Sequence, residues 1–291
     1  MGKNHVIEIG SLLPMITSLL ESFTKSERKV AEAVLKDPQQ IIYASITDFA
    51  ENVGVGDTTI IRFCRKLGFK GYQGFKMALA QEVSVTQNKH DVVLNEDIED
   101  SDTVDTVIQK LYNNQNQALQ ETMSLLSSKE VVKAVDLLME SKQIHFYGVG
   151  SSGVTALDAK YKFIRIGLPV DCFMDGHIMA MDATLLTSKD TVVGISYSGS
   201  TKDTIHALEL AKKAGAHTIC ITHHARSPIT KYADVILLMS SKEGPLQGGA
   251  VSTKVAQLFV IDILYTEVFR RSNEAAENKK KTGKAIEDKL L

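Results

Sequence analysis

The sequence predicts two domains: an N-terminal all-α helix-turn-helix domain and a C-terminal α/β domain with a doubly wound, five-stranded parallel sheet. Three observations carry this prediction. From about residue 10 to residue 84, apolar residues recur at helical spacing with no strand pattern. Beyond residue 143, short apolar runs rich in β-branched residues alternate with amphipathic segments, which is typical of parallel sheets covered by helices. The 291 residues also suffice for two domains.

Composition and patterning place the boundaries between these parts. We expect the helix-turn-helix domain at residues 10–86, with its motif at about 46–65. A polar, acidic stretch predicts a linker at 87–102, followed by the α/β domain with its N-terminal helices at 103–272 and a charged tail at 273–291. Strands are expected at 144–149, 170–174, 191–197, 218–222 and 235–238. Helices of the second domain are expected near 128–140, 154–166, 178–186, 202–214, 228–232 and 250–271.

Loops rich in hydroxyl groups and glycine follow two of the expected strands. The first loop contains Gly150, Ser151 and Ser152, and the second contains Ser196, Ser198, Gly199, Ser200 and Thr201. Each leads into a helix, whose unpaired N–H groups and dipole favour a bound anion. Because parallel strands end at one edge of a sheet, the two loops are expected to converge on one crevice that holds a phosphate. One such loop alone is an ordinary turn and N-cap sequence, so the pair carries the prediction.

Residues 46–65 have the spacing of a helix-turn-helix motif. Apolar side chains fall where two short helices would pack across each other, at Phe49, Val53, Val55, Ile60 and Phe63. Ala50 is small where the helices must cross, and Gly54 lies in the expected turn. Thr47 and Asp57 are the expected N-caps of the two helices. In this motif the first turn of the second helix enters the major groove of DNA.

The second helix of the motif opens a basic stretch. Between residues 60 and 81 every charged residue is basic, namely Arg62, Arg65, Lys66, Lys70 and Lys76. We expect this basic surface to neutralise DNA phosphates, and Thr58, Thr59 and Arg62 to reach base edges. Asp57 directly precedes the two threonines on the exposed first turn of the helix. A small helical subdomain with a solvated basic face is the alternative that this pattern leaves open.

Four stretches resemble a known family. SERKVAEAVL at 26–35, IIRFCRKLGFKGYQGFK at 60–76, and the two loops at 148–153 and 196–201 resemble RpiR-type (MurR/HexR-like) transcriptional regulators. In that family a helical DNA-binding domain, a linker and a sugar isomerase (SIS) domain, which is a phosphosugar-binding module, follow one another in the same order. The resemblance covers nearly the whole chain.

The resemblance implies a sequence-specific regulator of sugar or amino-sugar metabolism whose SIS domain senses a phosphosugar effector. It implies a homodimer or tetramer on a double-stranded, palindromic DNA operator, with no cofactor. The serines and Thr201 of the two loops would hold the phosphate. His177, which follows the second strand, is a further expected ligand contact, and Ser252, Lys254 and Gln257 at the start of the last long helix are weaker candidates.

The alternative function is a phosphosugar isomerase or lyase with an accessory helical domain. Isomerisation requires a general base near the sugar. The resemblance to SIS domains implies that the enzymes with this domain commonly carry a Glu shortly after the second loop, where this chain has Asp203. His223 and His224 are adjacent in a strand pattern, so we expect them to point to opposite faces. We therefore predict no catalysis and no metal site. An assembly scaffold with a vestigial pocket is a third possibility.

Composition argues against a membrane or secreted protein. No apolar run reaches the roughly 20 residues that a membrane span needs. Cys64, Cys172 and Cys220 are odd in number and lack metal-binding spacing, which favours reduced thiols. We expect a cytoplasmic protein without membrane contact.

Overall fold

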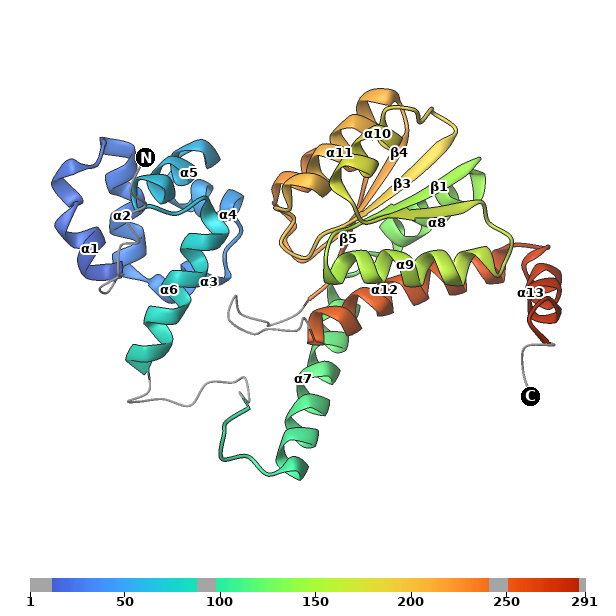
Figure 1. Ribbon diagram of the computed structural model, residues 1–291, viewed down its shortest axis with the longest axis horizontal. Helices are drawn as coiled ribbons and strands as arrows, with labels where there is room; N and C mark the ends of the chain where they lie inside the picture. Colours follow the sequence, from blue (N-terminus) through green and yellow to red (C-terminus); the bar gives the residue numbers. More distant parts are fainter. Residues whose placement is uncertain (1–11, 88–97, 241–250, 288–291) are drawn as a thin grey trace, which may run out of the picture. The chain divides into compact units, whose positions relative to one another are not determined.

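The structure is a computed structural model that describes residues 12–87, 98–240 and 251–287 (Figure 1). These residues divide into two compact units, one formed by 12–87 and the other by 98–240 with 251–287. The regular elements of the first described unit are all helical, and the second holds a five-stranded parallel sheet. Both halves of the predicted fold class are therefore confirmed. None of the helices in the described ranges has the length and apolar character to cross a membrane.

The first unit packs short helices around an aromatic core. Its elements are α1 (Leu12–Ser18), a 3-10 turn η1 (Leu20–Ser22), α2 (Lys25–Lys36), α3 (Pro38–Tyr43), α4 (Ile46–Val53), α5 (Asp57–Lys66) and α6 (Tyr72–Gln87). The ring of Phe63 in α5 lies 5.2 Å from Phe23 and 5.7 Å from Phe75 between centroids. Because buried aromatic rings contribute large apolar areas, this cluster fixes α5 and α6 on the rest of the unit.

The helix-turn-helix motif is α4 and α5, but its caps differ from the prediction. Ser45 caps α4 by accepting from the Asp48 N–H at 3.0 Å, whereas Thr47 lies inside the helix. Gly56 occupies the N-cap position of α5, so Asp57 is the first helical residue. Both predicted N-caps are therefore wrong, because Ser45 supplies the cap hydroxyl ahead of Thr47 and the chain turns at Gly56. The predicted turn glycine, Gly54, ends α4, and its N–H donates to the Glu51 carbonyl.

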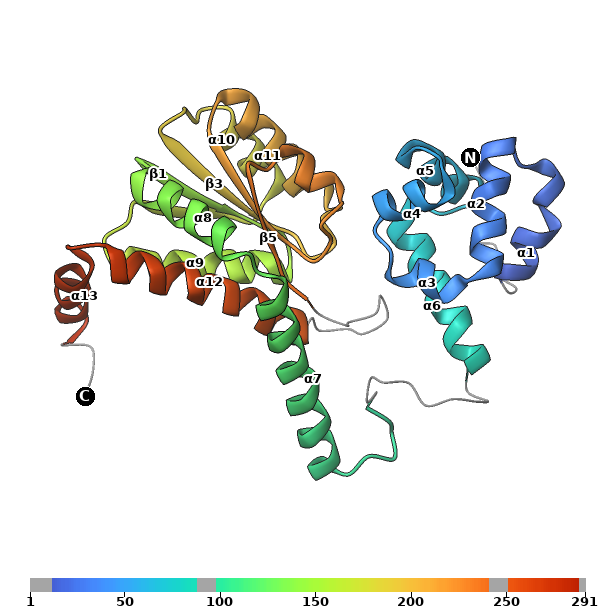
Figure 2. The ribbon, with the colours of Figure 1, turned by 180° about the vertical axis from the view of Figure 1, so that it is seen from behind.

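The second unit surrounds its sheet with helices. In chain order its elements are α7 (Val104–Leu125), α8 (Ser128–Glu140), β1 (Gln143–Tyr147), α9 (Ser151–Ile164), β2 (Val170–Phe173), α10 (Gly176–Ala183), β3 (Asp190–Ile195), α11 (Lys202–Ala214), β4 (His217–Thr222), the 3-10 turn η2 (Pro228–Tyr232), β5 (Val235–Leu238), α12 (Val251–Arg271) and α13 (Ala275–Lys284). Buried residues of α8, α9 and α12 pack on one face of the sheet, and those of α10 and α11 on the other (Figures 1 and 2). The charged tail thus contains a helix, α13.

The strand order places the two predicted loops side by side. The sheet runs β2-β1-β3-β4-β5, and all its pairs are parallel. From β1 the chain crosses to β2 on one side and later continues with β3 on the other, which makes the junction of β1 and β3 a topological switch point. Tyr147 at the end of β1 stands opposite Gly194 of β3. The loops after β1 and β3 therefore leave adjacent strand ends at the edge where ligands bind in such sheets.

Candidate functional site

The loop after β1 turns tightly into α9. A Cβ atom on Gly148 would lie 2.8 Å from the Ser152 carbonyl oxygen, and one on Gly153 would lie 2.8 Å from the Gly148 carbonyl oxygen. Both positions are therefore restricted to glycine by close backbone approach. Ser151 and Ser152 form the first turn of α9, three residues earlier than the helix start that we predicted. Their backbone N–H groups belong to the unpaired end of the helix.

The loop after β3 is organised by its own hydroxyl groups. Ser196 Oγ donates to Thr201 Oγ1 at 3.1 Å, and Ser198 Oγ accepts from the Ser200 N–H at 3.2 Å. Gly199 has a φ of +59°, and a Cβ there would lie 2.1 Å from Ser227 Oγ, so no other residue fits. Thr201 occupies the N-cap position of α11, where its hydroxyl makes no capping hydrogen bond. The N–H groups of the first turn of α11 are thus left to be satisfied by another acceptor.

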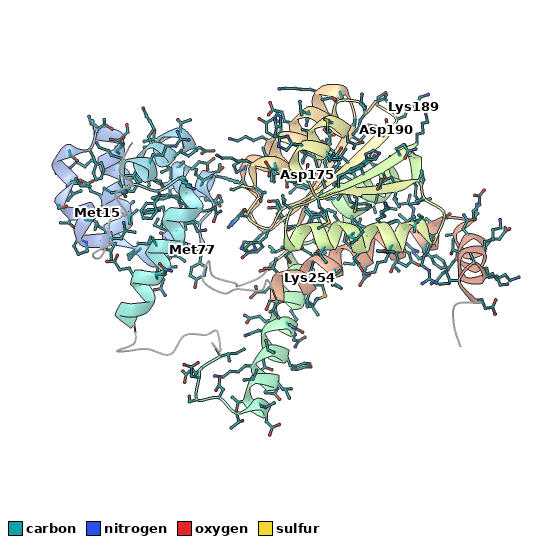
Figure 3. The ribbon with its side chains drawn as sticks, in the orientation of Figure 1. Met15, Met77, Asp175, Lys189, Asp190 and Lys254 are labelled. Carbon is teal, nitrogen blue, oxygen red and sulfur yellow. The ribbon has the colours of Figure 1, made fainter. Side chains whose placement is uncertain are left out.

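The start of α12 supports the first loop. Gln257 Nε2 donates to Ser152 Oγ at 3.0 Å, while Gln257 Oε1 accepts from Thr155 Oγ1 at 2.7 Å. Lys254, labelled at the N-terminal end of α12 in Figure 3, donates from Nζ to the Ser151 carbonyl oxygen at 2.6 Å. Partial burial lowers the pKa of Lys254. Two of the weaker sequence candidates therefore reach the first turn of α9, and Ser252 lies in the first turn of α12.

His177 lies at the same edge of the sheet, in the first turn of α10. Its backbone N–H donates at 2.9 Å to Asp175 Oδ1, which caps the helix, and its side chain is exposed. A Cβ on Gly176 would lie 2.8 Å from Cγ of Asp203, so the first turns of α10 and α11 are in direct contact. Asp203, the residue considered as a base, thus lies against the backbone of α10.

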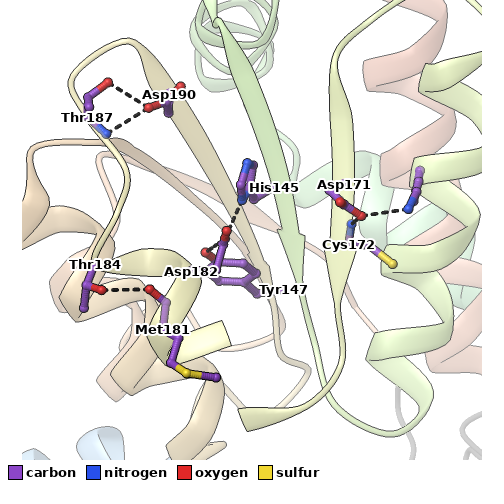
Figure 4. A network of polar contacts seen from close by, with 10 residues as sticks. His145, Tyr147, Asp171, Cys172, Met181, Asp182, Thr184, Thr187 and Asp190 are labelled. Carbon is purple, nitrogen blue, oxygen red and sulfur yellow. Dashed lines mark hydrogen bonds and ion pairs between the residues drawn. The ribbon is translucent and has the colours of Figure 1, made fainter. Parts of the chain in front are cut away.

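A buried polar network joins β1 to α10, and Figure 4 shows its members His145, Tyr147 and Asp182. One carboxylate oxygen of Asp182 in α10 accepts from the Tyr147 hydroxyl and contacts Nδ1 of His145. Burial raises the pKa of Tyr147 far above its usual range. Because Tyr147 directly precedes Gly148, this carboxylate joins α10 to the strand that carries the loop. Sequence reasoning missed the network, although His145 and Tyr147 are polar residues two positions apart, on one face of a strand whose opposite face carries Ile144 and Phe146.

The prediction for His223 and His224 is wrong. Their ring centroids are 4.7 Å apart, and the His223 ring stacks on Tyr197 at 5.2 Å. The reason is that β4 ends at Thr222, so the two residues no longer alternate across the strand. Throughout the described residues, no three His, Cys, Asp or Glu side chains gather as metal ligands would.

The motif of the first unit presents part of the predicted basic surface. Side chains exposed on or after α5 are Thr58, Arg62, Arg65 and Lys70, and Asp57 is half-exposed. Lys66 is also exposed, yet its ammonium donates to the Ser22 carbonyl oxygen and lies 3.4 Å from a Glu27 carboxylate oxygen. This internal pairing offsets part of its charge.

Two predicted DNA contacts are wrong. Thr59 is 7% exposed and Lys76 is 6% exposed, so neither can reach a nucleic acid in this fold. Thr59 lies beside Ile60 on the buried side of α5. Lys76 donates from Nζ to the Ala44 carbonyl oxygen at 2.9 Å, and burial lowers its pKa to about 8.

The comparisons with known proteins cover both units. Residues 10–86 match the helix-turn-helix domain of the rpiR family, and residues 137–267 match the SIS domain. An HTH-type transcriptional regulator of Haemophilus influenzae is 42% identical over 274 residues, which are 94% of this chain and 95% of the relative. The chain belongs to the RpiR family of transcriptional regulators. The regulator RpiR of Escherichia coli K12 is 32% identical, over 95% of this chain and 92% of its own.

A solved structure extends the likeness over nearly the whole chain. The NanR protein of Vibrio vulnificus, complexed with ManNAc-6P, is 30% identical and superposes with a TM-score of 0.84, covering 97% of this chain and 100% of that one. The relatives that match this chain over most of its length are transcriptional regulators. This chain is therefore a transcriptional regulator and not an enzyme, as the sequence predicts.

Proposed function

We propose that this RpiR-family regulator binds a specific DNA operator and controls sugar or amino-sugar metabolism in response to a phosphorylated sugar. The effector site is formed by the two loops at the switch point and by the first turn of α10. Its residues are Gly150, Ser151, Ser152, Ser196, Ser198, Gly199, Ser200, Thr201 and His177. The likeness to NanR, whose solved structure holds ManNAc-6P, supports a phosphosugar as the effector class.

The observation that carries the proposal is the pairing of two helix starts at adjacent strand ends. The first turns of α9 and α11 follow β1 and β3, which are neighbours in the sheet. The unpaired N–H groups and positive dipole ends of both helices favour a dianionic phosphate. The hydroxyls of Ser198 and Thr201 add donors, and the ammonium of Lys254 adds a positive charge at the first turn of α9.

On the DNA side, we propose that α5 reads the major groove. Thr58 and Arg62 are exposed on this helix and would reach base edges, while Arg65 and Lys70 would contact phosphates. A homodimer would present two copies of α5 to the half-sites of a palindrome. The effector would act by linkage, and a coupling free energy of about 1–3 kcal/mol changes operator occupancy several-fold or more.

A thermal-shift screen of the full chain tests the effector site. Phosphosugars, including ManNAc-6P, are compared with their unphosphorylated parents, because a ligand that binds the native state raises the midpoint by mass action. We expect a shift with phosphorylated sugars alone, and loss of that shift in the double variant Ser198→Ala, Thr201→Ala. The matched control is Ser188→Ala with Thr266→Ala, two exposed hydroxyls outside the loops. A response that survives in the loop variant places the effector elsewhere.

A further inference from the structure

The backbone of the loop after β3 is held by the end of β4. Tyr197 lies in this loop, between Ser196 and Ser198. Its carbonyl oxygen accepts from the backbone N–H of His223 at 3.0 Å and from the Thr222 hydroxyl at 3.2 Å. The Tyr197 ring also stacks on the His223 ring, with 5.2 Å between centroids. A displacement of the loop backbone therefore acts directly on His223.

His223 also contacts the residue that follows β5. Its Nδ1 donates to the Met239 carbonyl oxygen at 3.1 Å, and because a carbonyl oxygen only accepts, Nδ1 carries a proton in this contact. The Met239 N–H donates in turn to the Thr222 carbonyl oxygen at 3.0 Å, and Met239 is buried. The side chain of His223 therefore connects the loop after β3 to the end of β5.

The next residue, Ser240, is bound by α7. Its N–H donates to Thr122 Oγ1 at 3.0 Å, and its Oγ donates to Glu121 Oε2 at 2.7 Å. Thr122 Oγ1 donates in turn to the Ala118 carbonyl oxygen of its own helix at 2.7 Å. Thr122 is 0% exposed and Ser240 is 6% exposed, so water does not compete for the contact between them. The end of β5 is therefore fixed to the last turns of α7 (Figures 1 and 2).

Helix α7 is the first helix after the DNA-binding unit along the chain. It spans Val104–Leu125, whereas the described part of the DNA-binding unit is formed by residues 12–87. The loops and helices of the proposed effector site all follow α7 in the sequence. A shift of α7 within its own unit is therefore passed to the chain that leads to the DNA-binding unit.

We propose that His223 and Ser240 are positioning residues that couple phosphosugar binding to DNA binding. A phosphate at the start of α11 would hold the loop after β3 in one position. A series of contacts, termed the relay, would pass that position to α7 through Tyr197, His223, Met239, Ser240, Glu121 and Thr122. The relay rests on the proposed function, because it is the route by which the effector would act. Its steps lie in series, so each of them is needed.

The competing route runs through α12. Gln257 of α12 holds Ser152 in the loop after β1, and α7 also packs against α12. Most residues of the proposed effector site, however, lie in the loop after β3, which is the loop that His223 contacts. Since the two routes leave the site through different loops, variants distinguish them.

Operator binding with and without sugar measures the coupling. The DNA probe is a labelled duplex that the wild-type chain selects from a random pool. The sugar probe is ManNAc-6P, or the sugar of the thermal-shift panel that gives a larger shift. The coupling factor is the ratio between the operator Kd values measured with and without saturating sugar, for which allosteric proteins give about 5–150-fold.

Ser240→Ala and His223→Phe should each reduce the coupling factor by about threefold to thirtyfold. Ser240→Ala removes the donor to Glu121, and His223→Phe removes the donor to Met239 but keeps an aromatic ring beside Tyr197. The Kd for sugar alone and the Kd for DNA alone should each change by less than about twofold, since neither residue belongs to a proposed binding site. A merely structural defect would not separate these quantities.

The matched controls carry the same substitutions outside the relay. Ser124→Ala changes an exposed residue of α7 whose hydroxyl donates to the Glu121 carbonyl oxygen within its own helix. His217→Phe changes an exposed residue at the opposite end of β4. Both should keep the wild-type coupling factor. Circular dichroism verifies that each variant is folded, and Ser240→Ala alone carries the test if His223→Phe does not fold.

Hydrogen exchange locates the effect in the molecule. In wild type, bound sugar should slow amide exchange both in the loop after β3 and in α7 around Thr122. In Ser240→Ala the loop should still respond, and α7 should not. A response of α7 that survives this substitution overturns the relay.

The binding data can also contradict the proposal. A wild-type coupling factor in Ser240→Ala overturns the relay, and coupling that is then lost in Gln257→Leu assigns the route to α12. An equal loss in the two controls, or losses that add in the double variant, overturns it as well, because steps in series fail together. In each of these cases wild type still responds to sugar, so the proposed function stands. If no sugar of the panel changes wild-type operator binding, the proposed function fails and the relay with it.

Discussion

The side-chain amide of Gln257 links α12 to α9: its Nε2 donates to Ser152 Oγ at 3.0 Å, although the two residues are 105 positions apart in the sequence. The same side chain accepts from Thr155 Oγ1, and its burial excludes water from both bonds. Ser152 belongs to the proposed effector loop. From α12, Gln257 therefore holds the hydroxyl of a residue in the proposed effector loop without being part of that loop.

Replacing Gln257 by leucine should remove the two side-chain hydrogen bonds by which α12 holds the start of α9. Gln257→Leu leaves the buried Thr155 hydroxyl with only its long 3.5 Å contact to the Ser151 carbonyl oxygen, and it removes the donor to Ser152. This should cost about 1–3 kcal/mol of unfolding free energy. We also expect a smaller thermal shift with the phosphosugar that stabilises wild type. Gln120→Leu, an exposed position on α7, is the control. Unchanged stability and an unchanged shift would show that the bridge does not position the loop.

Arg62→Ala should weaken operator binding and leave phosphosugar binding intact, because the two sites belong to separate compact units. Loss of one phosphate or base contact should also reduce the salt slope of log Kd by about one. Fluorescence anisotropy at several salt concentrations measures both effects. The control is Arg28→Ala, since Arg28 is exposed but paired with Glu32 at 3.2 Å. A variant that loses both DNA and sugar binding contradicts the two-site assignment.

Lys76 should give the first unit a distinct pH dependence. Its pKa is about 8 in the folded protein and near 10.5 ordinarily, so between these values the unfolded chain binds more protons. The contribution of Lys76 to the free energy of unfolding therefore rises with pH through this window and is unfavourable below it. Lys76→Met should raise stability at pH 7 by about 1–3 kcal/mol, because no charge need be buried.

Urea unfolding of Lys76→Met and wild type at pH 7 and at about pH 9.5 measures this effect. The difference in unfolding free energy between Lys76→Met and wild type should be smaller at the higher pH. Comparing differences removes the opposite trend of Cys64, whose pKa is raised by burial to about 12. The Ala44 carbonyl keeps the Tyr72 hydroxyl as a donor at 3.2 Å, so the variant leaves no orphan acceptor there. A difference in unfolding free energy that stays the same at both pH values would refute the lowered pKa of Lys76. So would the same pH-dependent difference in Lys70→Met, where the replaced lysine is exposed.

The fold could be predicted because its signals are local. β-branched runs, serine-rich loops and the phase of the helix-turn-helix lie within short windows, and the structure confirms the fold class that they predict. The burial of Lys76 can also be predicted from local sequence. Tyr72, Phe75, Lys76 and Leu79 follow the spacing of one helical face, and all four side chains are buried. In contrast, Ser45 and Thr47 are both favoured N-cap residue types, and the small preference for serine does not decide between two positions so close together.

The contacts beneath and beside the loops could not be predicted, because they join residues that only the tertiary fold brings together. Asp182 lies 35 positions from Tyr147, and nothing local to either residue indicates the other. The same holds for Gln257 and Ser152. Such pairs depend on which helix crosses which strand, and that is decided by the packing of the whole sheet.

Breaking the carboxylate network should test whether it stabilises the unit and its loop together. Asp182→Asn and Tyr147→Phe should each lower the unfolding free energy by about 1–3 kcal/mol, since each disturbs a buried hydrogen bond. The double variant should cost less than the sum of the two, by about 0.5–3 kcal/mol, because both changes act on the same Tyr147–Asp182 hydrogen bond. Urea unfolding measures the cycle, and Glu140→Ala on the exposed end of α8 is the control. Strict additivity would mean that Tyr147 and Asp182 act independently, in which case α10 does not hold β1 through this carboxylate.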